Sequence, residues 1–174
     1  LLKENKKNLF TIIAPRHIQR SQKIKSLCDK FKLSSQILND GELINPNNEI
    51  IILNSFGVLQ TYFKYAKSVF IGKSTIKKLE NDSGQNPLEA AKLRCKIYHG
   101  PYVYNFSDIY EILKNSKISF VINNYNELSN YLKNDFELQN KDKSKTSEII
   151  KELGNKTLVD TLKNINRFMF NESN

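Results

Sequence analysis

The residues best suited to binding chemistry lie in the middle of the chain, in the stretch SGQNPLEAA from Ser83 to Ala91. Asn86 followed by Pro87 is typical of a helix start, because Asn caps the first amides and Pro lacks an N–H that would have no partner there. A helix start presents backbone N–H groups to an anion. Glu89, one turn later, can accept a hydrogen bond from a sugar hydroxyl. The stretch therefore predicts either an ordinary capped helix or an anion site.

The spacing of the cysteines and histidines predicts neither a metal site nor a redox site. Cys28 and Cys95 lie far apart with no CxxC pair, and the two histidines are also distant from each other. Both cysteines are predicted to be buried, reduced thiols of a cytosolic protein. We therefore expect no metal ion and no other cofactor.

The formal net charge of +9 indicates an anionic partner. Lys greatly outnumbers Arg, however, and the lysines are scattered along the chain. Nucleic-acid recognition relies on Arg for bidentate contacts, so no nucleic acid is expected as a partner, whereas weak attraction to an anionic membrane surface stays open. No apolar run approaches the ~20 residues that cross a bilayer. Because the first residue is Leu1 rather than Met, we interpret the chain as a piece of a longer protein, with residues 1–8 as linker.

Short apolar runs alternate with helical patterns along the chain. The runs predict six strands, at residues 9–14, 35–38, 49–53, 68–71, 96–99 and 118–122. Periodic apolar residues predict helices at 18–31, 58–66, from 87, from 105 or 107, at 124–132 and at 157–169, with a polar connection over 133–145. The alternation predicts an α/β, Rossmann-like fold, a doubly wound six-stranded parallel sheet with strand order 3-2-1-4-5-6.

That strand order places a switch point between the first and fourth strands, where ligands bind beyond the carboxyl ends. The first strand ends at Pro15-Arg16-His17 and the fourth at Gly72-Lys73-Ser74. We therefore expect Arg16, the backbone near Gly72 and the helix start at Asn86 to meet at one crevice. No GxGxxG follows the first strand and no Walker A motif exists, which argues against NAD and ATP. An Arg at this place suggests a side-chain contact to a phosphate.

Four segments, in this order, resemble the Kdo transferases, the 3-deoxy-D-manno-octulosonic acid transferases of lipopolysaccharide assembly. The segments are IIAPRHIQR (12–20), a Gly turn after the third strand, NPLEAA (86–91) and GPYVYNF (100–106). The resemblance is clearest from about Phe10 to Leu113, and PRH together with NPLE is a fairly specific pair. It implies the carboxy-terminal lobe of a GT-B glycosyltransferase, over residues 9–174, which binds the CMP part of CMP-Kdo.

The resemblance also implies the residues that would hold CMP. Pro15 and Arg16 would contact the phosphate region, and the remaining contacts would come from Phe56, Gly57, Val58, Asn86, Pro87, Leu88 and Glu89, with Glu89 on the ribose. It implies no catalytic residue here, because the family's general base lies in the amino-terminal lobe, so this fragment alone is expected to be inactive. The acceptor would be a lipid A precursor at the cytoplasmic face of the bacterial inner membrane, and this domain itself would be soluble.

Four positions depart from the family pattern. Val58 replaces a carboxylate, Lys73 stands where a second Gly is usual, and Gln85 and Tyr102 each replace a His. Weaker nucleotide binding than in the family is therefore expected. The run Gly41-Glu42-Leu43 has the Gly-acidic pattern that the family shows after its third strand. Here it follows the second strand, so it is rejected as a match to that motif.

Simpler interpretations stay open beside the family-based ones. Arg16 can pair with a surface carboxylate, Glu89 can lie on a solvated helix face, Lys73 can be a solvated loop residue, and His99 is expected to be structural. The whole chain can also be a lobe of another GT-B enzyme with a different nucleotide sugar, or a degenerate lobe that binds a partner and no nucleotide.

Overall fold

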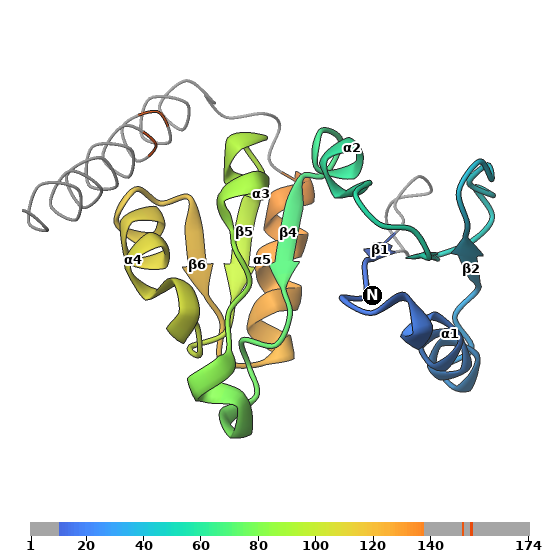
Figure 1. The fold of residues 1–174 in the computed structure, drawn as a ribbon, viewed down its shortest axis with the longest axis horizontal. Helices are drawn as coiled ribbons and strands as arrows, with labels where there is room; N and C mark the ends of the chain where they lie inside the picture. Colours follow the sequence, from blue (N-terminus) through green and yellow to red (C-terminus); the bar gives the residue numbers. More distant parts are fainter. Residues whose placement is uncertain (1–10, 138–150, 152–153, 155–174) are drawn as a thin grey trace, which may run out of the picture. The chain divides into compact units, whose positions relative to one another are not determined.

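The computed structural model describes residues 11–137, with residues 151 and 154. The chain divides into two compact units, Leu1–Tyr62 and Phe63–Asn174, and each is described by itself (Figure 1). The predicted linker at 1–8 and the predicted last helix at 157–169 lie outside the described residues. Within the described ranges, no helix is long and apolar enough to cross a membrane.

The first unit contains a three-stranded parallel sheet. Its strands are β1 (Thr11–Ile13), β2 (Ser35–Leu38) and β3 (Ile50–Leu53), and their order is β1-β3-β2. A 3-10 turn, η1 (Ile18–Arg20), leads into α1 (Ser21–Lys30), and α2 (Leu59–Phe63) follows β3. The expected helix at 18–31 is thus present, with its first turn tightened. Cys28 of α1 is buried with a free thiol, as predicted.

The prediction that the second strand lies at the centre of this half is wrong, because β3 pairs with both β1 and β2. The reason is visible in side-chain burial. Ile51 and Ile52 of β3 are fully buried, whereas Ser35 and Gln36 of β2 keep partial exposure. A central strand is covered on both faces and suits a continuous apolar run, so IIIL takes the centre and SQIL takes the edge.

The second unit contains another three-stranded parallel sheet. Its strands β4 (Ser68–Ile71), β5 (Lys96–His99) and β6 (Ser119–Val121) have the order β4-β5-β6, as predicted. Between them lie η2 (Lys77–Asp82), α3 (Leu88–Lys92), η3 (Tyr104–Phe106) and α4 (Ser107–Asn115), and α5 (Tyr125–Glu137) follows β6. The α/β class with parallel sheets is therefore confirmed, and the strands lie in two sheets of three.

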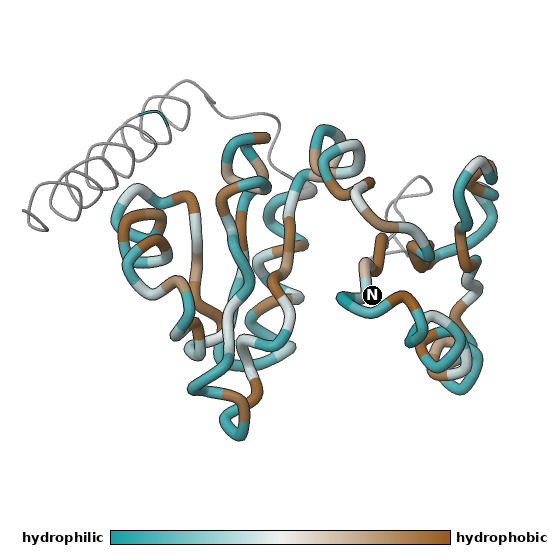
Figure 2. Tube along the Cα trace, viewed as in Figure 1, coloured by the Kyte–Doolittle hydropathy of each residue, from teal (hydrophilic) through white to brown (hydrophobic). Residues whose placement is uncertain are grey.

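The two faces of β5 pack against different helices. Ile97 lies in a core with Ala90 and Ala91 of α3 and Leu113 of α4. The next side chain, Tyr98, points to the opposite face, because side chains alternate along a strand. Hydrophobic residues concentrate on the strands and on the side of α4 that faces them (Figure 2).

A polar cluster joins α5 to the other face of this sheet. The Asp135 carboxylate accepts hydrogen bonds from Ser68 Oγ and Tyr98 Oη, both at 2.6 Å, and pairs with Lys96 Nζ at 2.5 Å. The Tyr98 ring packs on Tyr131, with 5.3 Å between the ring centroids. Burial, reinforced by the neighbouring Asp135 carboxylate, raises the pKa of Tyr98. The Tyr98 hydroxyl therefore remains a neutral donor to Asp135.

The cluster explains why α5 is longer than expected. The prediction ended this helix at Leu132 and began a polar connection at Lys133, but the helix runs on to Glu137. The helical last turn of α5 places Asp135 where it contacts Ser68, Lys96 and Tyr98 of the sheet. The predicted cap at the other end is present, since Asn124 Oδ1 accepts from the Glu127 N–H at 3.0 Å.

Replacing Asp135 by Ala is expected to lower the free energy of unfolding by about 2–3 kcal/mol, because it leaves Lys96 and the Tyr98 hydroxyl without their shared acceptor. Urea denaturation followed by circular dichroism measures this change. The control is Asp29→Ala, which removes the exposed pair of Lys25 with Asp29, 3.7 Å apart. That variant should lose less than about 0.5 kcal/mol. Equal losses in the two variants would contradict the anchoring role of Asp135.

Candidate functional site

Two loops at the carboxyl end of the second sheet are tied together by Ser74. Its side chain is fully buried, and Oγ donates to the Ile71 carbonyl at 2.6 Å while accepting from the Gly100 N–H at 2.8 Å. The Ser74 carbonyl accepts from the Tyr102 N–H at 2.9 Å. The loop after β4 and the loop after β5 are therefore held as one rigid cradle, defined here as residues 72–87 and 100–106.

Two glycines permit close backbone contact within the cradle. A Cβ on Gly100 would lie 2.2 Å from the Ser74 carbonyl oxygen, so only Gly fits there. Gly84 has φ +86°, and a Cβ on it would lie 3.0 Å from Val103 Cα. The neighbouring Ser83 carbonyl accepts from the Asn105 N–H at 3.1 Å. Backbone therefore packs on backbone along much of the cradle.

The predicted helix start is present in the cradle, but one residue later than expected: α3 begins at Leu88, and Pro87 rather than Asn86 is its N-cap residue. Asn86 Oδ1 accepts from the Leu88 N–H at 2.9 Å, and the carbonyl of buried Pro87 accepts from the Ala91 N–H at 3.0 Å. The side chains of Asn86 and Glu89 lie at the surface. Because α3 has only five residues, few peptide dipoles are aligned, and its electrostatic pull on an anion is weaker than a long helix would give.

His99 forms the floor of the cradle and is almost fully buried, at 2% exposure. Its Nδ1 lies 2.7 Å from the Gly100 carbonyl, so Nδ1 carries the proton and Nε2 is the bare nitrogen of the neutral ring. The ring packs on Tyr110, 4.3 Å between centroids, and Tyr110 Oη donates to the Gln85 carbonyl at 2.8 Å. Burial lowers the pKa of His99, and the nearby charge of Lys114 lowers it further, while the Gly100 bond opposes both. The structural role expected for His99 fits this setting.

The first unit carries the other candidate residues. Arg16 and His17 are exposed just after β1, and Pro15 is half-buried. In the turn after β3, Phe56 is 69% exposed and Gly57 has φ +77°. These positions leave Arg16 and Phe56 accessible to a ligand.

Val58 and Glu42 have structural roles in the first unit. Val58 packs against the core cluster of Leu38, Ile51 and Leu53, so this residue of the predicted nucleotide turn is a packing residue. The rejected Gly41-Glu42-Leu43 run closes its own turn, because Glu42 accepts from the Asn39 side chain and N–H, each at 2.9 Å. These hydrogen bonds lower the pKa of Glu42.

Of the predicted nucleotide contacts, Asn86 and Leu88 are joined by a direct hydrogen bond. Ser74, Gly100, Gln85 and the Asn86 turn all belong to the second unit. The predicted meeting of Arg16 with Asn86 involves both units and stays a prediction. Sequence reasoning missed Ser74, since a single Ser after a strand carries no signal of the carbonyl and amide that it will join. Among the residues that the structure describes, no group of His, Cys, Asp and Glu could hold a metal ion.

No protein-family model matches the chain. The fold is similar to the crystal structure of the C-terminal CMP-Kdo binding domain of WaaA from Acinetobacter baumannii, with a TM-score of 0.72, 17% identity, and coverage of 86% of this chain and 76% of that one. The 3-deoxy-D-manno-octulosonic acid transferase of Rickettsia prowazekii is 30% identical over 131 residues, which are 75% of this chain and 27% of that protein. The chain resembles the carboxy-terminal lobe of a Kdo transferase.

Two other relatives are also glycosyltransferases that match this chain over part of their length. The Kdo transferase of Haemophilus influenzae is 29% identical over 106 residues, 61% of this chain and 24% of that protein. A bifunctional glycosyltransferase/methyltransferase of Fusobacterium nucleatum is 30% identical over 123 residues, 70% of this chain and 19% of that protein. The chain thus spans about a quarter of the length of the curated relatives that it matches.

Replacing Gly100 by Ala is expected to lower the free energy of unfolding by at least about 2 kcal/mol, because the new Cβ forces the Ser74 carbonyl away. Thermal and urea unfolding measure this loss. Gly72 is the matched control, since a Cβ there meets nothing within 4 Å. Gly72→Ala should change stability by less than about 0.5 kcal/mol. A Gly100→Ala variant as stable as Gly72→Ala would contradict the packed cradle.

The buried imidazole of His99 is expected to make stability fall as pH decreases from 7 to 5. An unfolded His takes up a proton near pH ~6.5, whereas folded His99 resists it, so acidification favours the unfolded chain. His99→Phe should flatten this dependence of the unfolding free energy on pH, measured in urea at each pH. His17→Phe, the same substitution at the exposed histidine, should retain the wild-type slope. A slope unchanged in His99→Phe would contradict the assignment.

Proposed function

We propose that this chain is the nucleotide-sugar-binding lobe of a glycosyltransferase that transfers Kdo from CMP-Kdo to a lipid A precursor in lipopolysaccharide biosynthesis. The observation that carries the proposal is the NPLE turn, Asn86 to Glu89, whose preceding residues are held by the Asn105 N–H on the Ser83 carbonyl and by Tyr110 Oη on the Gln85 carbonyl. The CMP-Kdo binding domain from Acinetobacter baumannii shares this fold, which supports CMP-Kdo as the ligand.

The proposal has several parts beyond the ligand. Residues 9–174 act as one binding domain with 1–8 as linker, and the two three-stranded sheets are the halves of one doubly wound sheet. The general base comes from an amino-terminal lobe, so this chain by itself does not catalyse transfer. The acceptor lipid lies at the cytoplasmic face of the inner membrane, and the net charge of +9 favours that anionic surface.

Each proposed ligand residue acts on a different part of CMP. Glu89 accepts a hydrogen bond from the ribose hydroxyl, while Asn86, Pro87 and Leu88 shape the turn that holds it. Arg16, with Pro15 beside it, contacts the phosphate through a charge-assisted bond worth about 1.5–3 kcal/mol. In transfer, such a positive group stabilises CMP as it leaves with negative charge.

The turn after β3 contributes less to the proposed CMP binding than Arg16 and Glu89 do. Exposed Phe56 offers a ring face, Gly57 offers a backbone approach, and Val58 holds the turn on the core. A valine accepts no hydrogen bond from a nucleotide, so the affinity for CMP is expected to be lower than with a carboxylate there. The same observation favours the second candidate function, a degenerate lobe that binds a partner protein and no nucleotide.

Isothermal titration calorimetry of the chain with CMP, CDP and UDP separates these functions. The proposal predicts heat of binding with CMP and weaker or no binding of UDP. A preference for UDP would replace Kdo by another nucleotide sugar. No heat with any of the three at millimolar ligand would favour the degenerate lobe.

Arg16→Ala is expected to weaken CMP binding at least about tenfold, because one charge-assisted hydrogen bond to phosphate is lost. The same titration with CMP measures the change. Arg20→Ala removes another exposed arginine, one turn away in η1, and should leave the affinity unchanged. If the two variants bind CMP equally well, Arg16 has no role at the phosphate.

A further inference from the structure

The backbone of Lys73 is in an unusual conformation for its place in the fold. Four residues other than Gly have positive φ in the described part of the chain, and all four are Lys or Arg: Lys32, Lys73, Arg94 and Lys117. Three of them, Lys32, Arg94 and Lys117, follow the C-cap residue of a helix, where a left-handed residue is common. Lys73 instead follows strand β4, with φ +64°. A glycine would fit here without strain, so what Lys73 adds is its side chain.

The ammonium group of Lys73 forms an ion pair with Asp82 that is easily exchanged. Lys73 Nζ lies 2.6 Å from Asp82 Oδ2; the lysine side chain is 25% exposed and the aspartate side chain 78% exposed. An ion pair with so exposed a carboxylate contributes little to stability, because water solvates the carboxylate nearly as well. The ammonium can therefore leave Asp82 for a stronger acceptor at little cost.

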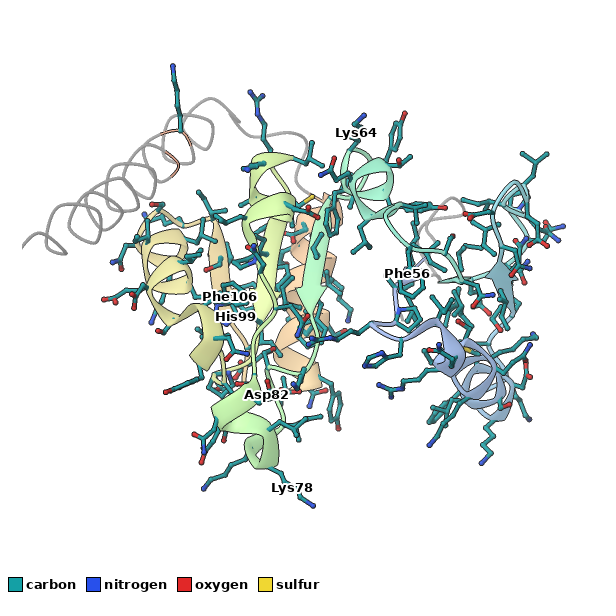
Figure 3. The ribbon with its side chains drawn as sticks, in the orientation of Figure 1. Phe56, Lys64, Lys78, Asp82, His99 and Phe106 are labelled. Atoms are coloured by element: carbon teal, nitrogen blue, oxygen red, sulfur yellow. The ribbon has the colours of Figure 1, made fainter. Side chains whose placement is uncertain are left out.

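The backbone position of Lys73 is fixed within the cradle. Ser74, the next residue, is locked to Ile71 and Gly100, so Lys73 begins at the carboxyl end of β4. Asp82 ends η2 and lies four positions before Asn86 in the same loop. Lys78, on the same turn, points away from the sheet (Figure 3). Lys73 thus differs from the neighbouring lysines in having a fixed origin beside the predicted nucleotide turn.

We propose that Lys73 is a phosphate ligand of the nucleotide site, whose ammonium exchanges Asp82 for the phosphate of CMP when the nucleotide binds. The inference rests on the proposed function, because it assigns a further residue to that same site. A Lys supplies a flexible point charge that suits a phosphate without demanding bidentate geometry. Asp82 acts as the competing anion that holds the ammonium while the site is empty.

A purely structural ion pair makes different predictions. If Lys73 and Asp82 only stabilise the loop, removing either one weakens the fold and has the same direction of effect on ligand binding. If Lys73 is a ligand and Asp82 its competitor, the two substitutions have opposite effects on CMP affinity. The signs of the two changes therefore decide between the two roles.

The test is calorimetric titration of the wild type, Lys73→Gly, Asp82→Asn and Lys78→Ala with CMP, and with cytidine as the probe that lacks the phosphate. Lys73→Gly relieves the backbone and removes the ammonium, so CMP should bind about tenfold more weakly while cytidine binding is unchanged. Asp82→Asn should tighten CMP about two- to fivefold, because the competing carboxylate is gone. Lys78→Ala should match the wild type.

Each outcome has a separate meaning. Wild-type affinity for CMP in Lys73→Gly, or weaker binding in Asp82→Asn, overturns the role of Lys73 and leaves the proposed function intact. An equal loss of CMP and cytidine binding in Lys73→Gly also overturns it, because the effect is then not at the phosphate. Absence of CMP binding by the wild type overturns the proposed function and this inference together.

Discussion

The buried hydroxyl of Ser74 is the constraint on which the candidate site depends. It donates a hydrogen bond to the Ile71 carbonyl at the end of β4 and accepts one from the Gly100 N–H just after β5. Unpaired, these groups would cost free energy in the interior. Their pairing through one side chain requires the two loops to approach within contact distance, which in turn requires Gly100 to lack a Cβ. The position of the Lys73 backbone follows from this approach, and the later part of the same loop is held by Tyr110 Oη on the Gln85 carbonyl.

A second polar anchor acts at the other end of the same sheet. Asp135 ties α5 to β4 and β5 through Ser68, Lys96 and Tyr98. On the opposite face, Tyr110 of α4 packs on His99 of β5. The second unit therefore has a core closed on both faces, with its variable chemistry confined to the loops after the strands. Such a division, with rigid layers and functional loops at the carboxyl ends, is typical of parallel α/β folds.

Local signals in the sequence predicted local structure well. The helix start near Asn86–Pro87, to within one residue, the strands and the order β4-β5-β6 were predicted because each depends on neighbouring residues or on a short right-handed connection. The central position of β3 was not predicted, although its unbroken apolar run is typical of a strand buried on both faces, because the default doubly wound order places the second strand there. The length of α5 and the role of Ser74 depend on partners far along the chain, which no periodicity reveals. Of the candidate site, the helix start was predictable, whereas the cradle that holds it was not.

The central claim is that CMP is bound by the loops at the carboxyl ends of the strands. Amide chemical-shift mapping of the ¹⁵N-labelled chain during titration with CMP tests it most directly, because every backbone N–H reports separately. We expect shifts to concentrate at residues 72–74 and 84–89 of the second unit and at 15–17 of the first, with little change along α5. Saturating shifts confined to α5 and the amino ends of the strands, or no shifts at millimolar CMP, would contradict it.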